Sequence, residues 1–363
     1  MLSYQMLPDN KRVENEKAIV PKVLEFVRQL KIGLIYGPIS PEDHPYYRRA
    51  LLSGPAKGMS VTSVASTLAE EGFSIEIINP DLFGFIDRLK NIDFALIMIH
   101  GPHGEDGKMQ GLLDYLRIPY LGPSVLPSAI CNSKTTCKTM VRSLGISTPS
   151  STTLLPRSAK AIGDLISSSG LTFPVMLKGD TGGSSVGMAQ CNNVDEVVSR
   201  ISTVDPKTPY FCESFVKGRV CTVSLIQLGT EMFCTEPIEV ETERAFYDEI
   251  SKLEGGSSGA AVRFHCPARL SKLAAEKCMK DARSIAEQLQ LTVHGRVDFI
   301  VSDDESAHFL EVNTLPSLSS AATFAKGGLT LGFSYPELLL LLIRASLINE
   351  IDAVYSGQYE RAL

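Results

Sequence analysis

Short apolar runs and stretches of helical spacing alternate through the first third of the chain. Three runs, at 31–37, 73–78 and 94–99, are apolar along most of their length, which is typical of buried parallel strands. Apolar residues recur at helical spacing over 61–69, between the first two runs, and 111–116 is helix-like after the third. Strands and helices that alternate at this interval predict a parallel sheet with helices on its faces.

The remainder of the chain mixes helices and strands, and no internal repeat is found. Residues 1–30 are expected to form a charged helical lead-in. Helices are predicted at 133–144, 194–203 and 271–290, with a terminal helix after Pro336, and strands at 173–178, 209–215, 220–227 and 232–239. This order predicts an α/β protein in which a parallel N-terminal sheet is followed by two mixed regions.

Polar side chains on two predicted strands near the C-terminus share one face of a hairpin. Arg296 and Asp298 alternate with apolar residues on the first strand, as Glu311 and Asn313 do on the second. The polar turn at 302–306 joins the strands, so the four groups are expected on one wall. Oxygens from two carboxylates and an amide suit Mg²⁺ that also binds nucleotide phosphates. The alternative is a half-exposed hairpin with solvated carboxylates.

A glycine-rich segment at 178–187 is the second candidate for chemistry. Lys178 ends an apolar strand, and the glycines after it allow backbone N–H groups to approach anionic oxygens. The segment is neither a Walker A motif nor a Rossmann G-x-G-x-x-G. Taken alone it is an ordinary flexible connection. Together with the acidic wall, Lys178 favours a nucleotide site.

The third candidate is the segment 99–111, which runs from the end of a parallel strand into a helix. Ligands of α/β sheets bind at such strand ends, and a helix N-terminus favours negative charge. His100 is a donor for a carboxylate or phosphate there. The alternative is a capping turn in which Glu105 and Asp106 complement the helix dipole.

Composition narrows the class of protein. The chain has 363 residues, of which 44% are hydrophobic, which is enough for two or three globular domains. A formal charge of -6 argues against a nucleic-acid partner. The sequence has no secretory signal pattern and no apolar run of membrane length, so we expect no membrane partner and a cytoplasmic location. The eight cysteines lack a paired spacing and are expected to be reduced and buried.

Four motifs in order resemble the D-alanine–D-alanine ligases of the ATP-grasp superfamily. They are HGPHGEDGKMQG, FPVMLKGDTGGSSVGM, GRVDF and LEVNTLPS. The resemblance implies the ATP-grasp fold, with an N-terminal parallel βαβ domain at 31–130 and two α+β domains at 131–217 and 218–363 that clamp ATP. It also implies a homodimer, formed through the N-terminal domain, with a role in peptidoglycan (cell-wall) biosynthesis.

The resemblance also implies a reaction. In this family ATP phosphorylates the carboxylate of one amino acid, and the amine of a second attacks the acylphosphate. The products are a peptide bond, ADP and phosphate. The expected substrates are therefore small amino acids, and the expected cofactors are ATP and two Mg²⁺ ions, with Mn²⁺ as an alternative.

Site residues are implied motif by motif. Asp298, Glu311 and Asn313 match the metal ligands, and Lys134, Lys178 and Lys252 match the phosphate-binding lysines. Glu213, Phe215 and Val216 match the residues that bind adenine. The catalytic or substrate-side residues are matched by Arg296, Ser184, His100 and again Lys252. Arg296 matches the arginine that steadies the acylphosphate and the tetrahedral intermediate, a task that suits a planar fork of donors.

Several substrate-side positions depart from the family pattern. Glu42 or Asp43 stands near the place of the glutamate that grips the first substrate's ammonium, and Leu253 replaces the lid tyrosine. Ser317 replaces the glycine after Pro316, and Ala322 replaces the serine that holds the second substrate's carboxylate, with Ser320 and Thr323 nearby. These departures raise an alternative, a ligase of a pair other than two D-alanines in specialised metabolism.

The acid expected to accept both ribose hydroxyls falls at Val220, which leaves Lys217, Arg219 or another group to compensate. Loss of a charged hydrogen bond there is worth about 1.5–3 kcal/mol. This position and Leu253 support a further alternative, a nucleotide-binding regulator without ligase activity. A carboxylating ATP-grasp enzyme is disfavoured, because the motifs resemble the peptide-forming branch.

Overall fold

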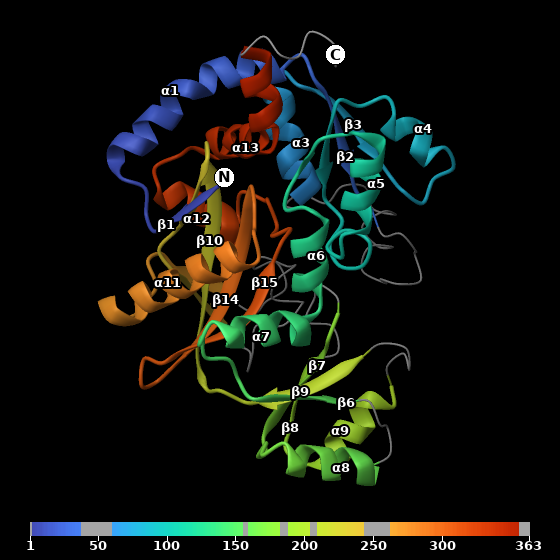
Figure 1. The fold of residues 1–363 in the computed structure, drawn as a ribbon, viewed down its shortest axis with the longest axis vertical. Helices are drawn as coiled ribbons and strands as arrows, with labels where there is room; N and C mark the ends of the chain where they lie inside the picture. The colour runs from blue at the N-terminus through green and yellow to red at the C-terminus, as the bar shows by residue number, and fades with distance from the viewer. Residues whose placement is uncertain are drawn as a thin grey trace.

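A computed structural model describes residues 2–37, 60–154, 159–181, 188–203, 209–242 and 262–355. These residues contain three sheets with helices packed around them (Figure 1). The first is a parallel sheet of order β3-β2-β4-β5, which confirms the predicted βαβ region. Its strands are β2 (Lys31–Ile35), β3 (Ser74–Ile78), β4 (Phe94–Ile97) and β5 (Tyr120–Leu121), and its helices are α3 (Ser60–Glu70), α4 (Phe85–Leu89) and α5 (Lys108–Leu116).

The second sheet is antiparallel and lies at the bottom of Figure 1. Its order is β6-β9-β7-β8, formed by β6 (Ser151–Leu154), β9 (Tyr210–Ser214), β7 (Val175–Gly179) and β8 (Ala189–Cys191). The helices α8 (Ala159–Ser168) and α9 (Val194–Ile201) pack against it through buried apolar residues such as Ile162 and Val197. We call it the central sheet.

The third sheet has seven strands and carries the predicted hairpin. They are β1 (Ser3–Gln5), β11 (Glu231–Cys234), β10 (Gly218–Leu228), β12 (Ile238–Thr242), β13 (Val262–His265), β14 (His294–Ser302) and β15 (Ala307–Asn313). The prediction of a single strand at 232–239 is wrong, because two strands, β11 and β12, cover this region. Pro237 stands between them and has no N–H to donate to a ladder. The helix α11 (Lys272–Gln288) packs on one face.

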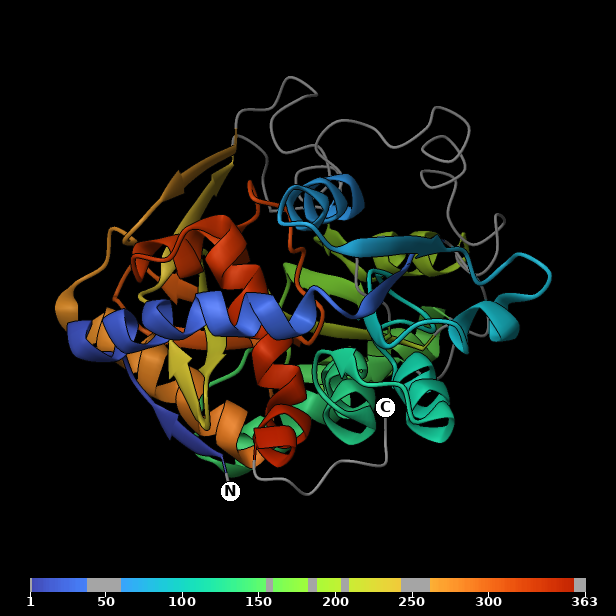
Figure 2. The ribbon, with the colours of Figure 1, turned by 90° about the horizontal axis from the view of Figure 1, so that it is seen from above.

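The N-terminal region is not helical throughout. Within the expected lead-in, helix α1 covers Asn10–Val27, whereas β1 pairs in parallel with β11 of the seven-stranded sheet. Asp9 caps α1 by accepting from the N–H of Arg12. One face of α1 is buried and carries a row of valines, including Val20 and Val27. That face lies beside α13 (Tyr335–Tyr355), as Figure 2 shows.

Two short helices lie between the sheets. α6 (Val125–Asn132) and α7 (Lys134–Ser143) follow β5, and α7 runs between the seven-stranded sheet and the central sheet (Figure 1). Cys131, Cys137 and Val141 join the core formed with α11. α7 therefore packs on the seven-stranded sheet while its first residues face the central sheet.

The cysteines and the apolar C-terminal helices also bear on the sequence predictions. All eight cysteines are free and seven are buried, as predicted, but Cys266 is exposed. In the described ranges no single helix has the length and apolar character needed to cross a membrane. α12 (Thr323–Thr330) and α13 meet that criterion only as a pair bent by 97°. Leu339 to Leu342 of α13 are buried in the core.

Candidate active site

The predicted hairpin of polar residues is confirmed. β14 and β15 pair antiparallel, with Arg296 opposite Asn313 and Asp298 opposite Glu311. Residues directly opposite one another extend their side chains from the same face of a sheet, so the four groups form one wall. The register shifts after Asp298, at an irregularity of the kind that re-aims side chains near functional sites.

Asp298 is the centre of this wall. Its two carboxylate oxygens accept from Nε and Nη2 of Arg296, each at 2.7 Å, and Oδ2 also accepts from the amide of Asn313 at 3.0 Å. The paired, planar contact holds the guanidinium in a fixed orientation. Asp298 is 5% exposed, so the bulk of the solvent is excluded from this pair.

The donor set of the wall fits a hard divalent cation. Asp298, Glu311 and the amide oxygen of Asn313 supply oxygens, and the Asn313 amide must turn that oxygen toward the ion. Across the described residues no group of three or more His, Cys, Asp or Glu side chains is arranged to hold a metal. Two carboxylates and an amide leave coordination positions for phosphate oxygens or water, which suits an ion that arrives with a nucleotide.

A pocket lies beside the wall. It has an empty volume of about 280 Å³ and is lined by Glu105, Cys131, Asn132, Lys134, Glu311, Val312, Asn313 and Thr314. Lys134 Nζ lies 3.7 Å from Glu311 Oε2. The structure therefore brings one predicted phosphate lysine next to two predicted metal ligands.

Asp180 positions Lys134. Its side chain accepts from the N–H of Thr135 at 2.7 Å and from the hydroxyl of Ser133 at 2.8 Å, and its carbonyl accepts from the N–H of Lys134 at 2.9 Å. These contacts join the first turn of α7 to the end of β7. The sequence reasoning missed this role, because Asp180 follows β7 and no local signal connects it with the start of α7.

Glu213 lies in a buried cluster with two lysines. Lys138 Nζ is 3.0 Å from Glu213 Oε2, and the Lys178 ammonium contacts Oε1. Burial raises the pKa of Glu213, but the charges of Lys138 and Lys178 outweigh it and hold that pKa below its usual value. Burial lowers the pKa of Lys138, and Glu213 opposes that effect.

The two lysines of this cluster differ from the sequence prediction. Lys178, predicted at the phosphates, lies against Glu213 here, so its phosphate contact stays a prediction. Lys138 was missed. The available signal was its position four residues after Lys134, on the same face of the predicted helix.

The segment around His100 forms a packed turn. His100 Nδ1 lies 3.5 Å from Glu105 Oε1, and Glu105 reaches the pocket. Asp106 accepts from the backbone N–H groups of His103 and Lys108, which is the capping role of the alternative interpretation. A Cβ on Gly104 would lie 2.0 Å from the carbonyl oxygen of Ile99, so only glycine fits there.

The remaining predicted residues are distributed as follows. Phe215 follows β9 and donates its backbone N–H to the carbonyl of Pro174 at 3.4 Å, and Val216 is next in the link to β10. Ala322 is the N-cap of α12 and makes no side-chain capping bond. Ser184 and Lys252 lie outside the described residues, as do Leu253, Glu42 and Asp43.

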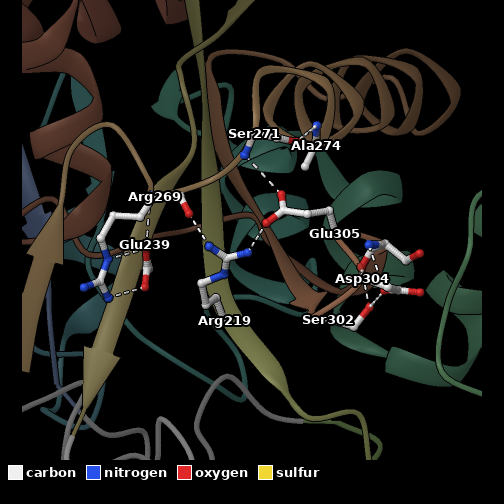
Figure 3. Close-up of polar contacts among 9 residues, drawn as sticks. Arg219, Glu239, Arg269, Ser271, Ala274, Ser302, Asp304 and Glu305 are labelled. Atoms are coloured by element: carbon white, nitrogen blue, oxygen red, sulfur yellow. Dashed lines mark hydrogen bonds and ion pairs between the residues drawn. The ribbon is translucent and has the colours of Figure 1, made fainter.

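Arg219 is engaged away from this site (Figure 3). Its guanidinium contacts the Glu305 carboxylate in the β14–β15 turn and the carbonyl of Arg269. Glu305 also accepts from the N–H of Ser271 at 3.1 Å, and Arg269 donates to Glu239 on β12 at 2.6 Å. Arg219 therefore braces the hairpin turn, which leaves Lys217 as the candidate to compensate for Val220.

Known proteins match this architecture along the chain. The family model described as D-ala D-ala ligase C-terminus matches residues 140–344, and the one described as D-ala D-ala ligase N-terminus matches 59–123. D-alanine--D-alanine ligase B of Clostridium perfringens is 30% identical over 325 residues, covering 89% of this chain and 100% of the relative. A D-alanine--D-alanine ligase of Bacillus anthracis is 31% identical over 320 residues, covering 88% and 97%.

Solved structures agree with the sequence matches. A crystal structure of D-alanine--D-alanine ligase from Bacillus anthracis superposes with a TM-score of 0.72 at 29% identity, covering 89% of this chain and 99% of that one. A second, complexed with ATP, has a TM-score of 0.69 at 27% identity with the same coverage. The chain therefore belongs to the D-alanine–D-alanine ligase family of ATP-dependent ligases.

Proposed function

We propose that the protein joins two amino acids, with D-alanine as the first candidate for both, through an acylphosphate and with release of ADP and phosphate. The observation that carries this proposal is that Lys134, Glu311 and Asn313 line one pocket, with Asp298 held behind them by the Asn313 amide. A triphosphate and a carboxylate repel one another, so a ligase needs such a mixture of cationic and metal-binding groups. The names of the relatives support the same reaction, and we propose that it serves peptidoglycan synthesis.

Asp298, Glu311 and Asn313 are proposed to hold two Mg²⁺ ions, or Mn²⁺ in their place. Bound ions would offset the charge of the phosphates during transfer. Lys134 is proposed to contact the phosphates, with Lys178 and Lys252. The pair of Lys134 and Glu311, at 3.7 Å, supports this role because a lysine there neutralises the wall before the nucleotide binds.

Arg296 is proposed to stabilise the oxyanion when the amine of the second amino acid attacks the acylphosphate. Its bidentate bond to Asp298 supports this role, because the guanidinium needs no reorientation as charge develops. His100 and Ser184 are proposed to contact the first substrate. Glu213 is proposed to accept from the adenine amino group, with Phe215 and Val216 beside it.

A second candidate is a ligase of the same mechanism with a different second amino acid. The observation that favours it is Ala322, which begins α12 without a hydroxyl where the family has a carboxylate-binding serine. Ser320 is exposed nearby, but its backbone N–H already donates to Ser63 Oγ at 3.3 Å. A second substrate with a larger or more polar side chain would fill the space beside Ala322 and would bind through hydrogen-bond donors other than a hydroxyl at that position.

We also propose a homodimer formed through the N-terminal sheet, and a cytosolic location where ATP is supplied. Exposed apolar residues on β3, on α4 and on the loop between them, namely Ile77, Leu82, Phe83 and Ile86, support the dimer proposal.

Phosphate release with a panel of D- and L-amino acids tests the proposed reaction. With ATP and Mg²⁺, release is expected only with a particular pair of amino acids. Asp298→Asn and Arg296→Ala should each lower the rate by at least about a hundredfold, since both remove charge from the reacting groups. Asp303→Asn, on the exposed turn of the same hairpin, is the matched control and should leave the rate unchanged. Phosphate release that no amino acid stimulates would contradict the ligase proposal.

A further inference from the structure

Lys138 is a charged side chain in the protein interior. It is 1% exposed and extends from α7 to three partners. Its ammonium lies 3.0 Å from Glu213 Oε2, donates to the carbonyl of Phe309 at 3.3 Å, and lies 5.7 Å from the centre of the Phe309 ring. A buried lysine is unfavourable unless it is paired in this way. Its partners come from β9 of the central sheet and from β15 of the seven-stranded sheet.

Lys138 and Lys178 bind different oxygens of Glu213, and only one of them is open to a ligand. The side chain of Lys178 is 15% exposed and stands at the end of β7, directly before the glycine-rich segment. The side chain of Lys138 is 1% exposed and has no comparable opening. If a bound phosphate were to draw Lys178 away, Glu213 Oε1 would become free, and Lys138 would keep its contact with Oε2.

We propose that Lys138 is a positioning residue that keeps Glu213 ionised and aimed for a 6-aminopurine, and thereby makes the enzyme select ATP over a 6-oxopurine triphosphate. This inference rests on the proposed role of Glu213 at the adenine amino group. An ionised carboxylate only accepts hydrogen bonds, which suits an amino group, whereas a protonated carboxyl donates and suits the 6-oxo group of inosine triphosphate. The selectivity for ATP therefore depends on Lys138, the counter-ion that remains beside Glu213 once Lys178 has moved to a phosphate.

The electrostatics of the cluster support this assignment. Glu213 is 1% exposed, and burial alone would raise its pKa toward the neutral form. Lys138 opposes that effect from a fixed position, since the Phe309 carbonyl and ring hold the ammonium in place. Phe309 lies two residues before Glu311, so Lys138 also connects the adenine acceptor to the strand that carries a proposed metal ligand.

Steady-state kinetics with ATP and inosine triphosphate test the proposal in wild type, Lys138→Met, Glu213→Gln and the double variant. Lys138→Met should raise the KM for ATP by about ten- to a hundredfold, with kcat changed less than about threefold. The preference for ATP over inosine triphosphate should fall by a similar factor. The double variant should be no worse than Glu213→Gln, since Lys138 acts through Glu213. Lys280→Met, at an exposed position of α11, is the matched control.

Two results would overturn the proposal. One is an equal rise in KM for both nucleotides in Lys138→Met, and the other is strictly additive effects in the double variant. If Lys138→Met does not fold, Lys138→Gln carries the test, because it keeps a donor for the Phe309 carbonyl and removes the charge. If wild type shows no turnover stimulated by amino acids, the proposed function fails, and the Kd values of the two nucleotides in the same variants still decide the role of Lys138.

Discussion

Two buried carboxylates of the candidate site are each held by side chains of opposite charge. Glu213 has Lys138 and Lys178, and Asp298 has Arg296. Removing one partner of a buried pair costs about 3–5 kcal/mol, whereas an exposed pair is worth about 0–1 kcal/mol. For substitutions of these residues, the free energy of unfolding therefore has to be measured together with the kinetic constants.

His294 is a buried group that should make stability depend on pH. It is 1% exposed, and its Nδ1 has no hydrogen-bond partner within the part of the chain that the structure describes. Burial lowers the pKa of His294 to about 3, whereas the unfolded chain titrates near its ordinary value of 6.5. The unfolded state therefore binds the extra proton below pH 6.5. The stability due to neutral His294 is present above that pH and is lost as pH falls toward 3.

The prediction concerns the pH slope of unfolding. Between about pH 6 and pH 4, His294 should lower the free energy of unfolding of wild type by up to about 1.4 kcal/mol per pH unit. His294→Leu should lose that part of the slope in urea unfolding measured at several pH values. His308→Gln, at a half-exposed position of β15, should keep it. An unchanged slope in His294→Leu would show that another group is responsible.

Among the elements, the β14–β15 hairpin is held at its turn as well as along its ladder. Arg219 on β10 reaches Glu305 in the turn, and Glu305 also receives the N–H of Ser271 at the start of α11 (Figure 3). The turn is thus fastened to a strand and to a helix. The contacts of the turn with β10 and with α11 both stabilise the register that places Asp298 opposite Glu311.

Arg219→Gln and Lys217→Gln should behave in opposite ways. Arg219→Gln should lower Tm by a few degrees, because a partly exposed ion pair and its network are worth about 1 kcal/mol, and should leave the KM for ATP unchanged. If Lys217 compensates for Val220 at the ribose, Lys217→Gln should raise the KM for ATP about tenfold with no change in Tm. If Arg219→Gln instead raised the KM for ATP without changing Tm, Arg219 would contact the nucleotide and its assignment to the hairpin turn would be wrong.

Elements with a local pattern were predictable, and those made by distant partners were not. The alternation around Asp298 and Glu311 is a local property, so the hairpin and its polar wall followed from it. β1 has only three residues and depends on a partner at 231–233, which no local signal identifies. Lys138 and Asp180 likewise owe their roles to partners in elements far away in the sequence.

At the scale of the whole molecule, the apolar surface on β3 and α4 is the candidate dimer contact. Phe83 is fully exposed on the loop between these elements, with Leu82 before it and Ile86 three residues after it. Large apolar groups that gather on a surface mark contact sites more often than scattered ones do. The parallel sheet carries this surface on its edge strand β3.

Light scattering after size-exclusion chromatography checks the dimer. Wild type at micromolar concentration should have twice the chain mass, and a Phe83→Ser, Ile86→Ser double variant should shift toward the monomer, since it removes the apolar area that the contact buries. Tyr115→Ser, which changes an exposed aromatic elsewhere, should stay dimeric. A monomeric wild type would contradict the dimer proposal.

The pairing of β1 with β11 has a consequence for the order of synthesis. Ser3 is synthesised before its partner Glu231, which follows only after roughly ten to fifty seconds at ordinary translation rates. α1 waits still longer for α13. The strands of the parallel and central sheets are thus synthesised while β1 and α1 still lack their partners. The apolar valines of α1 are accessible to chaperones or to non-native contacts until α13 has been made.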